Sequence, residues 1–512
     1  MSPTNRPHFL SLMRNSLYAS GGWILAAIVG FATTPYLVYR LTTEGYGAYI
    51  LLTSLAGYYG ILDLGLGQGI VKFVAEYEAK KEWNAIGACI NAALVFQCAA
   101  GILGSALIVV NADAILHLFK ITGALLLPAR MSIYIAAGTF LVTMLAATLN
   151  SVLAGLQLYG VVSALGNGSI VATAILSVVA LMSGGGLLAC VVISAVASIV
   201  LLCLTIWKVR VAIPSWEFSV RIQWGIFRSI LVFSAYMIVV KIADTFNNFV
   251  GRFVVGILLG PVAVAFYMVP SKVTNTGWGV LGSGIGVILP FASKVHASED
   301  HEFARKLCIR SSAVFAAIAL PLFCAIMLLS PWLLRVWMGE SFARQSQNVL
   351  SLLGVSGMAA SVTSVPVQLA LGFGRSKTIA FFGLGTVFAY ICALVWLVPV
   401  YGVDGAAFAL VLATIPGFGL VATIVRGYLK LPLSKYSWDV YGWHLPAIAL
   451  ALLLFAVRTF TYMLTPALDL ALSVLLILIY GLIVLRKGVL PLQDIKHILK
   501  REPETIKTAE DQ

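Results

Sequence analysis

Charged side chains are scarce in this chain of 512 residues. Asp, Glu, Lys and Arg make up only 10% of it, whereas hydrophobic residues make up 60%, and the mean hydropathy is +0.98. Soluble globular domains contain about 25% charged residues. This composition excludes a soluble globular protein and predicts an integral membrane protein.

Motifs for metal, redox or nucleotide chemistry are also missing. The seven cysteines include no Cys-x-x-Cys pair and lie in or beside apolar stretches, and the six histidines are scattered. The sequence therefore predicts no disulfide framework and no metal site. No P-loop is present, and the one G-x-G-x-x-G match, at 277–282, lies inside an apolar stretch with no strand before it. We expect no cofactor and no catalytic residues.

Fourteen apolar stretches are long enough to cross a bilayer, which takes about 20 residues per helix. The first is too long for a signal-peptide core and reads as an uncleaved membrane helix. The expected fold class is an all-α polytopic membrane protein. The stretches are 16–39, 46–71, 84–111, 130–155, 158–182, 186–209, 226–258, 260–290, 308–333, 346–372, 376–399, 404–428, 443–464 and 466–486.

Positive charge alternates between the connections. Of the 33 Lys and Arg residues, 24 fall at the N-terminus, in every second connection and in the C-terminal tail, and six fall in the other connections. Cytoplasmic loops carry the excess of Lys and Arg. We therefore expect a multi-pass protein of a prokaryotic plasma (inner) membrane with both termini in the cytoplasm. The net charge of +13 is a topology signal, and no nucleic-acid partner is expected.

The first twelve stretches form two similar halves, offset by 217–219 residues. Gly155 corresponds to Gly372, and the glycines at 184–186 correspond to the segment 402–405. Six spans per half predict parallel repeats, a transporter architecture with its site between the halves. The expected division is a six-helix lobe at 1–215, a second at 216–435, two further membrane helices at 436–490 and a polar cytoplasmic tail at 491–512.

The three remaining basic residues lie inside membrane stretches. A charge facing lipid at mid-membrane costs at least about 2.5–3.5 kcal/mol, so the polar stripe of the seventh stretch should face a protein interior or a water-filled cavity. Its basic character predicts an anionic substrate. Alternatively, Lys241 and Asp244 neutralise each other at i,i+3 and Arg252 snorkels outward. The stripe comprises Lys241, Asp244, Thr245, Asn248 and Arg252.

The eighth stretch repeats this design with Lys272 and Asn275 on one face. Under the 218-residue offset, the basic residues Lys241, Arg252 and Lys272 correspond to the uncharged residues Trp23, Thr34 and Ser54. The intramembrane positive charge thus belongs to the second half alone, which a symmetric structural role does not predict. We identify Lys241, Arg252 and Lys272 as candidate anion-binding residues.

Other polar residues inside the stretches leave alternatives open. Asp63, in the second stretch, is a candidate for ion coupling, for an ion pair with the other half or for a helix cap. The fourth stretch carries Thr139, Thr143 and Asn150. Hydrogen bonds between helices explain these neutral groups as well as contacts to a sugar do.

The segment Leu62-Asp63-Leu64-Gly65-Leu66-Gly67-Gln68-Gly69, preceded by Tyr46-Gly47-Ala48-Tyr49 and followed by Val71-Lys72-Phe73, resembles the start of Wzx-type polysaccharide flippases. These belong to the multidrug/oligosaccharidyl-lipid/polysaccharide exporter superfamily, which also matches in span number and repeat.

The resemblance implies a lipid-linked oligosaccharide on undecaprenyl pyrophosphate as substrate, and two lobes in a V that rock between inward-open and outward-open states. It also implies that the last two helices form a groove for the lipid tail. The expected partners are membrane lipids, a polysaccharide polymerase and a chain-length regulator.

Two other functions compete with a flippase. A cation-coupled multidrug extruder of the same superfamily would favour an acidic cavity for cationic drugs, and the excess of basic residues here disfavours it. A membrane-bound glycan polymerase or ligase would need a large external loop or a clustered catalytic set, and the sequence shows neither.

Overall fold

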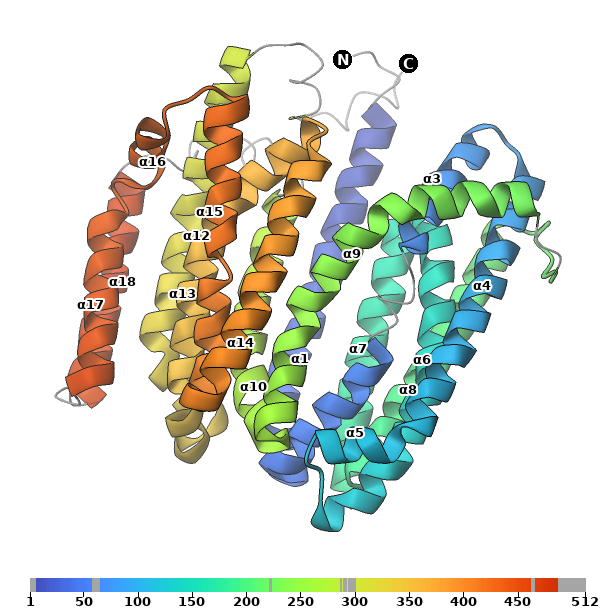
Figure 1. Cartoon of the computed structure of the whole chain (residues 1–512), viewed down its shortest axis with the longest axis horizontal. Coiled ribbons are helices and arrows are strands. Elements are labelled where there is room, and N and C mark those ends of the chain that lie inside the picture. The colour runs from blue at the N-terminus through green and yellow to red at the C-terminus, as the bar shows by residue number, and fades with distance from the viewer. Residues whose placement is uncertain are drawn as a thin grey trace, which may run out of the picture. The chain divides into compact units, whose positions relative to one another are not determined.

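The computed structural model describes residues 6–57, 65–220, 223–285, 288, 292, 301–461 and 466–486. Every regular element in these ranges is helical (Figure 1). The principal helices are α1 (Arg6–Gly57), α3 (Leu66–Ala79), α4 (Trp83–Val110), α5 (Ala112–Leu118), α6 (Leu126–Gly155), α7 (Tyr159–Met182), α8 (Leu187–Ala212), α9 (Trp224–Leu259), α10 (Pro261–Ile285), α12 (His301–Met338), α13 (Glu340–Gly372), α14 (Ser376–Leu412), α15 (Ile415–Ala422), α16 (Leu433–Tyr441), α17 (Leu445–Thr461) and α18 (Pro466–Arg486).

Within the described ranges, nine helical segments are long and apolar enough to cross a membrane, or ten if the bent pair α16–α17 counts as one span. Two of the nine contain a break and cover two predicted stretches each. These are α1, broken at Thr42, and the segment from α14 to Tyr428, broken at Gly402. The chain is therefore a multi-pass, all-α membrane protein, and the predicted fold class is confirmed. The count of fourteen stays a prediction.

A side-chain hydrogen bond stabilises the break in α1. Thr42 adopts a φ of 67°, which is rare for a β-branched residue, and its hydroxyl accepts a hydrogen bond from the Gly45 backbone N–H at 3.3 Å. A hydroxyl in this position satisfies one of the free N–H groups at the start of the following helical segment. The turn therefore separates the first predicted stretch from the second.

Left-handed backbone positions recur at the spacing of the predicted repeat. Such residues end one helix and begin the next, so their recurrence places equivalent breaks in both halves. This agreement between backbone geometry and sequence offset supports the two six-helix repeats. The pairs of positive-φ residues are Thr42 and Gly260, Lys120 and Gly339, Gln157 and Gly374, and Gly184 and Gly402, which lie 218, 219, 217 and 218 positions apart.

The chain packs as two compact units, one of residues 1–272 and 383–413 and the other of residues 273–382 and 414–512. In the first unit, the buried core gathers on α3, α4 and α6, with Ile70, Ile90 and Val152 among its members. In the second unit, the core centres on α12, with Phe323 and Met327 fully buried. The lobe boundaries expected at 215 and 435 stay predictions.

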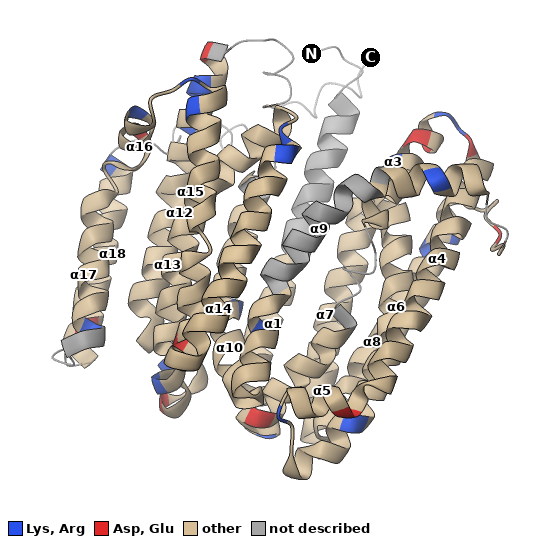
Figure 2. Cartoon of the chain, viewed as in Figure 1, with Lys and Arg blue, Asp and Glu red and all other residues tan. Residues whose placement is uncertain are grey.

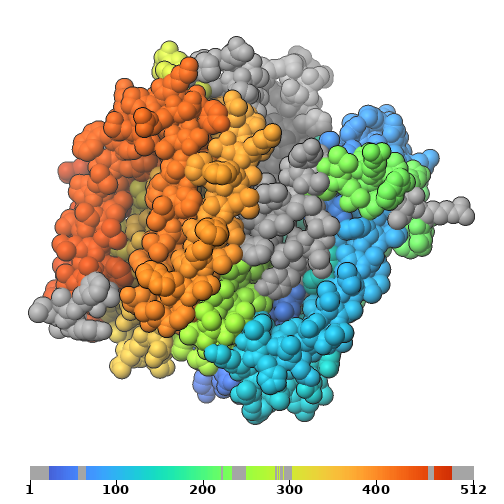
Figure 3. All heavy atoms as spheres, in the orientation of Figure 1, coloured from blue at the N-terminus to red at the C-terminus, as the bar shows by residue number. Residues whose placement is uncertain are grey.

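Charge is concentrated at the helix ends. Figure 2 shows helix shafts that are mostly free of Lys, Arg, Asp and Glu, with these residues near the turns. Many large apolar side chains are exposed along the shafts, including Leu103 on α4, Ile170 on α7 and Leu478 on α18. The space-filling view shows the orange-to-red part of the chain, which contains α15 to α18, as columns of closely packed atoms (Figure 3). Both features fit helices that face lipid.

One close backbone contact makes a glycine necessary. A Cβ atom added at Gly47 on α1 would lie 1.8 Å from the carbonyl oxygen of Pro261, the first residue of α10. The neighbouring atom belongs to backbone and cannot rotate away. Only glycine lets these two helix segments approach so closely.

We predict that Gly47→Ala destabilises the protein, because overpacking against backbone costs about 1–3 kcal/mol or more. The measurement is the melting temperature of the purified protein in detergent. Gly138→Ala on α6 is the matched control, since a Cβ atom there meets nothing within 4 Å. Equal melting temperatures for the two variants would contradict the contact.

Candidate anion-binding site

Arg252 extends from α9 to a hydroxyl of α1. Its Nη1 donates a hydrogen bond of 2.9 Å to the Ser54 hydroxyl, and its guanidinium lies over the Phe249 ring, 4.6 Å from the ring centroid. Ser54 is buried. The guanidinium is therefore directed to the protein interior, which favours the interior placement over snorkelling.

Lys272 makes an equivalent contact from α10. Its Nζ donates to the Thr34 hydroxyl at 2.7 Å and to the Gly30 carbonyl at 2.9 Å, both on the first half of α1. The Thr34 hydroxyl itself donates to the Gly30 carbonyl at 2.6 Å and is almost completely buried. Gly30 leaves room for the lysine, because a Cβ atom at that position would lie 3.3 Å from Lys272 Nζ.

These two contacts are related by the internal repeat. Arg252 and Thr34 are 218 positions apart in the sequence, as are Lys272 and Ser54. Arg252 therefore corresponds to Thr34, and Lys272 corresponds to Ser54. The Arg252–Ser54 contact and the Lys272–Thr34 contact thus occupy equivalent positions in the repeat. In each contact the second repeat supplies the cation and the first supplies the hydroxyl, so two equivalent positions of the fold each carry one positive charge.

Both contacts join a cation to neutral oxygen atoms. Phosphate oxygens offer hydrogen bonds and negative charge together, and arginine can bind them with two parallel hydrogen bonds. The role of Arg252 and Lys272 in anion binding stays a prediction.

The other predicted site residues have different outcomes. The backbone of Lys241, Asp244, Thr245 and Asn248 lies in α9, but their side chains are outside the described residues, so the Lys241–Asp244 pairing stays untested. Asp63 is also outside the described residues. On α10, Asn275 is exposed. Of the predicted residues, the structure therefore describes Arg252 and Lys272 in contact with α1.

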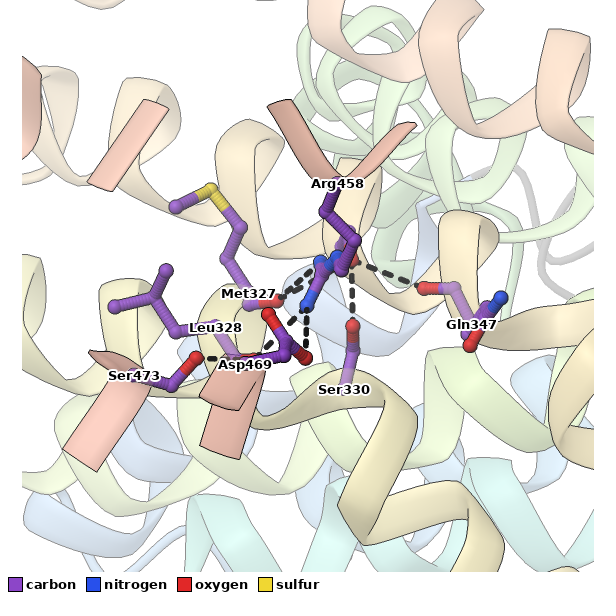
Figure 4. A network of polar contacts seen from close by, with 8 residues as sticks. Met327, Leu328, Ser330, Gln347, Arg458, Asp469 and Ser473 are labelled. Atoms are coloured by element: carbon purple, nitrogen blue, oxygen red, sulfur yellow. Dashed lines mark hydrogen bonds and ion pairs between the residues drawn. The ribbon is translucent and has the colours of Figure 1, made fainter. Parts of the chain in front are cut away.

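A buried ion pair in the second unit was not singled out by the sequence patterns. Arg458 on α17 lies 3.7 Å from the Asp469 carboxylate on α18. It also donates to the carbonyl oxygens of Leu328 and Met327, at 3.1 and 3.3 Å, and to the Ser351 hydroxyl at 2.8 Å. Figure 4 shows these groups converging on the guanidinium.

Pro331 in α12 explains why the arginine binds there. Proline has no backbone N–H, so the Met327 carbonyl four residues earlier loses its helical partner. Arg458 supplies the missing donor, and Ser351 donates to the same carbonyl at 3.2 Å. The sequence does contain the signal, a proline inside an apolar helix and an arginine and an aspartate in the last two stretches. Their pairing requires the packing of α17 and α18 against α12.

We predict that Arg458→Met destabilises the second unit by about 3–5 kcal/mol, because it leaves Asp469 buried without its cation. Replacing both residues, Arg458→Met with Asp469→Leu, should restore part of that loss. Melting temperature in detergent and protein level in membranes measure the effect. Arg344→Met is the control, since Arg344 pairs with Glu340 in an exposed salt bridge. A double variant less stable than the single variant would contradict the assigned pairing.

No group of three or more His, Cys, Asp or Glu side chains is placed to hold a metal ion in the part of the chain that the structure describes. The polar features of the first unit are instead hydrogen-bonding groups and cations within a helical membrane protein. The class that this fold defines is a polytopic helical membrane protein, in which Arg252 and Lys272 are candidate anion-binding residues.

Comparison with known proteins gives the family. The model of the "Polysaccharide biosynthesis protein" family matches residues 12–296, more than half of the chain. The chain belongs to this family. It is also similar to a "Putative O-antigen transporter" of Shigella flexneri, with 24% identity over 401 residues that cover 78% of this chain and 94% of the relative.

Solved structures of transporters share the fold. A lipid II flippase MurJ in an inward closed conformation has a TM-score of 0.71 and 14% identity, covering 93% of this chain and all of that one. An inward-facing multidrug resistance transporter of the MATE family, from the MOP superfamily, has a TM-score of 0.65 and 14% identity, covering 79% and 94%. These similarities show that the chain shares the fold of these transporters.

Proposed function

We propose that this protein is a flippase that moves a lipid-linked oligosaccharide from the cytoplasmic to the outer face of the plasma membrane for surface polysaccharide synthesis. The observation that carries the proposal is the pair of repeat-related cations, Arg252 and Lys272, bound to neutral oxygens of α1. The family membership and the transporter named among its relatives support the same function.

The substrate we propose is an oligosaccharide on undecaprenyl pyrophosphate. Its diphosphate carries the negative charge that these cations match, while the polyprenyl tail stays in lipid. Diphosphate oxygens would replace the Ser54 and Thr34 hydroxyls as acceptors for Arg252 and Lys272. Because those hydroxyl contacts join α1 to α9 and α10, their replacement loosens the packing of these helices when substrate arrives. This coupling gives alternating access a physical basis.

The surrounding pathway follows from the substrate. The flipped repeat unit is consumed outside by a polysaccharide polymerase and a chain-length regulator, which we propose as partners. No covalent bond changes during flipping, so the protein is not an enzyme in this proposal. The cytoplasmic termini and the inner-membrane location belong to the same proposal.

A cation-coupled multidrug extruder is the second candidate, because the fold of this chain is similar to that of a MATE-family transporter. Cationic drugs favour acidic groups, whereas the described site residues Arg252 and Lys272 are basic. This sign of charge favours the flippase.

We predict that Arg252→Ala and Lys272→Ala, expressed in a strain lacking the native gene, each lower export of surface polysaccharide about tenfold or more. A hydrogen bond to a charged group contributes about 1.5–3 kcal/mol, and about 1.4 kcal/mol corresponds to tenfold. The measurements are surface polymer and the sidedness of lipid-linked repeat units in membrane vesicles. Repeat units should accumulate on the cytoplasmic face.

Lys120→Ala is the matched control, because Lys120 also donates to a backbone carbonyl, that of Leu258, but from an exposed position. Its export should equal that of the native protein. Unimpaired export in both Arg252→Ala and Lys272→Ala would contradict the assigned site. In the strain without the gene, repeat units exposed outside but unpolymerised would indicate a polymerase or ligase, and normal polymer with altered drug sensitivity would indicate the extruder.

A further inference from the structure

A second polar feature of the first unit is a cavity of about 440 Å³ between α3, α6, α7 and α8. Its volume is within the range of small-molecule sites, about 300–1,000 Å³. Five polar side chains line it: Gln68, Thr143, Asn150, Ser151 and Ser198. The lining residues that the structure describes include no Asp, Glu, Lys, Arg or His, so this described lining differs in chemistry from the Arg252–Lys272 site.

Two serine hydroxyls of this cavity donate to backbone carbonyls of their own helices. Ser151 donates to the Ala147 carbonyl and Ser198 donates to the Ser194 carbonyl, each within its own helix. A hydroxyl that donates to its own backbone still has oxygen lone pairs for a donor from a ligand. Interhelical hydrogen bonding therefore does not account for these two residues.

Asn150 adds a buried amide to the same cavity. Its Oδ1 is out of contact with solvent and has no hydrogen-bond partner among the described residues. A buried polar atom of this kind is uncommon and calls for an explanation. A ligand hydroxyl donating to this oxygen would satisfy it.

Small side chains keep the cavity open. Ala146, Ala147 and Ala154 of α6 line it together with polar residues of the same helix. The face of α6 that lines the cavity therefore carries methyl groups, hydroxyl groups and an amide. Sugar rings present the same combination, because hydroxyl groups form their edges and C–H groups form their faces. The described lining offers a charged ligand no counter-ion, and a purely apolar ligand would leave the Asn150 amide unsatisfied.

The cavity lies towards the expected cytoplasmic end of the unit. Val71 lines it and precedes Lys72, and Ala154 lies next to the last residue of α6. Lys72, Lys80 and Lys81 belong to the positively charged side of the predicted topology. A glycan entering from the cytoplasm would meet this region before crossing.

We propose that this cavity binds an uncharged sugar residue of the lipid-linked oligosaccharide, with the Asn150 amide and Gln68 as its principal hydrogen-bonding groups. The inference rests on the proposed flippase function. In this proposal, Arg252 and Lys272 bind the diphosphate of the carrier, and the cavity binds the glycan.

The first test measures choice between glycans in the strain without the native gene. The measured quantity is the ratio between export of the native repeat unit and export of a foreign one. Asn150→Leu and Gln68→Leu should each change this ratio by about tenfold, because hydrogen bonds to the sugar are lost. Asn150→Ser, which keeps a hydrogen-bonding group, should retain part of the preference and shows that the site tolerates substitution. Thr139→Val is the matched control on the same helix, since Thr139 bonds its own backbone at the Ile135 carbonyl and does not line the cavity.

The second test places a probe in the cavity. Ala147→Cys, in full-length protein whose exposed cysteines Cys203 and Cys392 are replaced by alanine, is labelled with a maleimide in lipid nanodiscs. The purified lipid-linked repeat unit should slow labelling several-fold, whereas sugar-free undecaprenyl pyrophosphate should not.

The outcomes separate the two proposals. Equal protection by both ligands would assign the cavity to the carrier and overturn the sugar site. Absence of protection, or an unchanged export ratio in the Asn150 and Gln68 variants while Arg252→Ala still blocks export, would overturn the sugar site and leave the flippase intact. Export that does not depend on this protein at all would overturn the flippase itself.

Discussion

The free energy of holding positive charge inside a membrane governs the polar structure of this protein. Arg252, Lys272 and Arg458 lie on α9, α10 and α17, in stretches that the sequence predicts to cross the membrane, and each donates to oxygen atoms of another helix. Lipid offers no such acceptors, so each cation requires a specific neighbour. Every one of these contacts consequently fixes how two or more helices pack.

The same requirement is met in two chemically different ways. Arg458 has an anionic neighbour in Asp469 and fills the gap that Pro331 leaves in the hydrogen bonds of α12. That arrangement places a cation and an anion together within the protein and serves stability. Arg252 donates to the Ser54 hydroxyl, and Lys272 donates to the Thr34 hydroxyl and the Gly30 carbonyl. In the proposed function, phosphate oxygens of the substrate replace these neutral acceptors.

The two proposals assign charge and glycan to separate sites. In them, Arg252 and Lys272 bind the diphosphate of the carrier, and Asn150 and Gln68 in the cavity bind a sugar. Hydrogen bonds between neutral groups depend on their geometry, so they can discriminate between glycans. Changing such residues alters specificity without adding charge to the membrane interior.

The sequence determined the membrane class and the helical fold. Scarce charge and long apolar stretches require a polytopic helical protein, and positive-φ residues such as Thr42 and Gly260 occur where the sequence offset places equivalent turns. Arg252 and Lys272 stand out because charge is rare inside apolar stretches.

Only the tertiary structure decided what these residues meet. Helical periodicity gives the face on which a side chain lies, but its partner comes from a helix that is distant in sequence, as Ser54 is from Arg252 and Leu328 is from Arg458. The crosswise pairing of Thr34 with Lys272, the cavity beside Asn150 and the role of Pro331 therefore follow from packing between helices, which local sequence patterns do not encode.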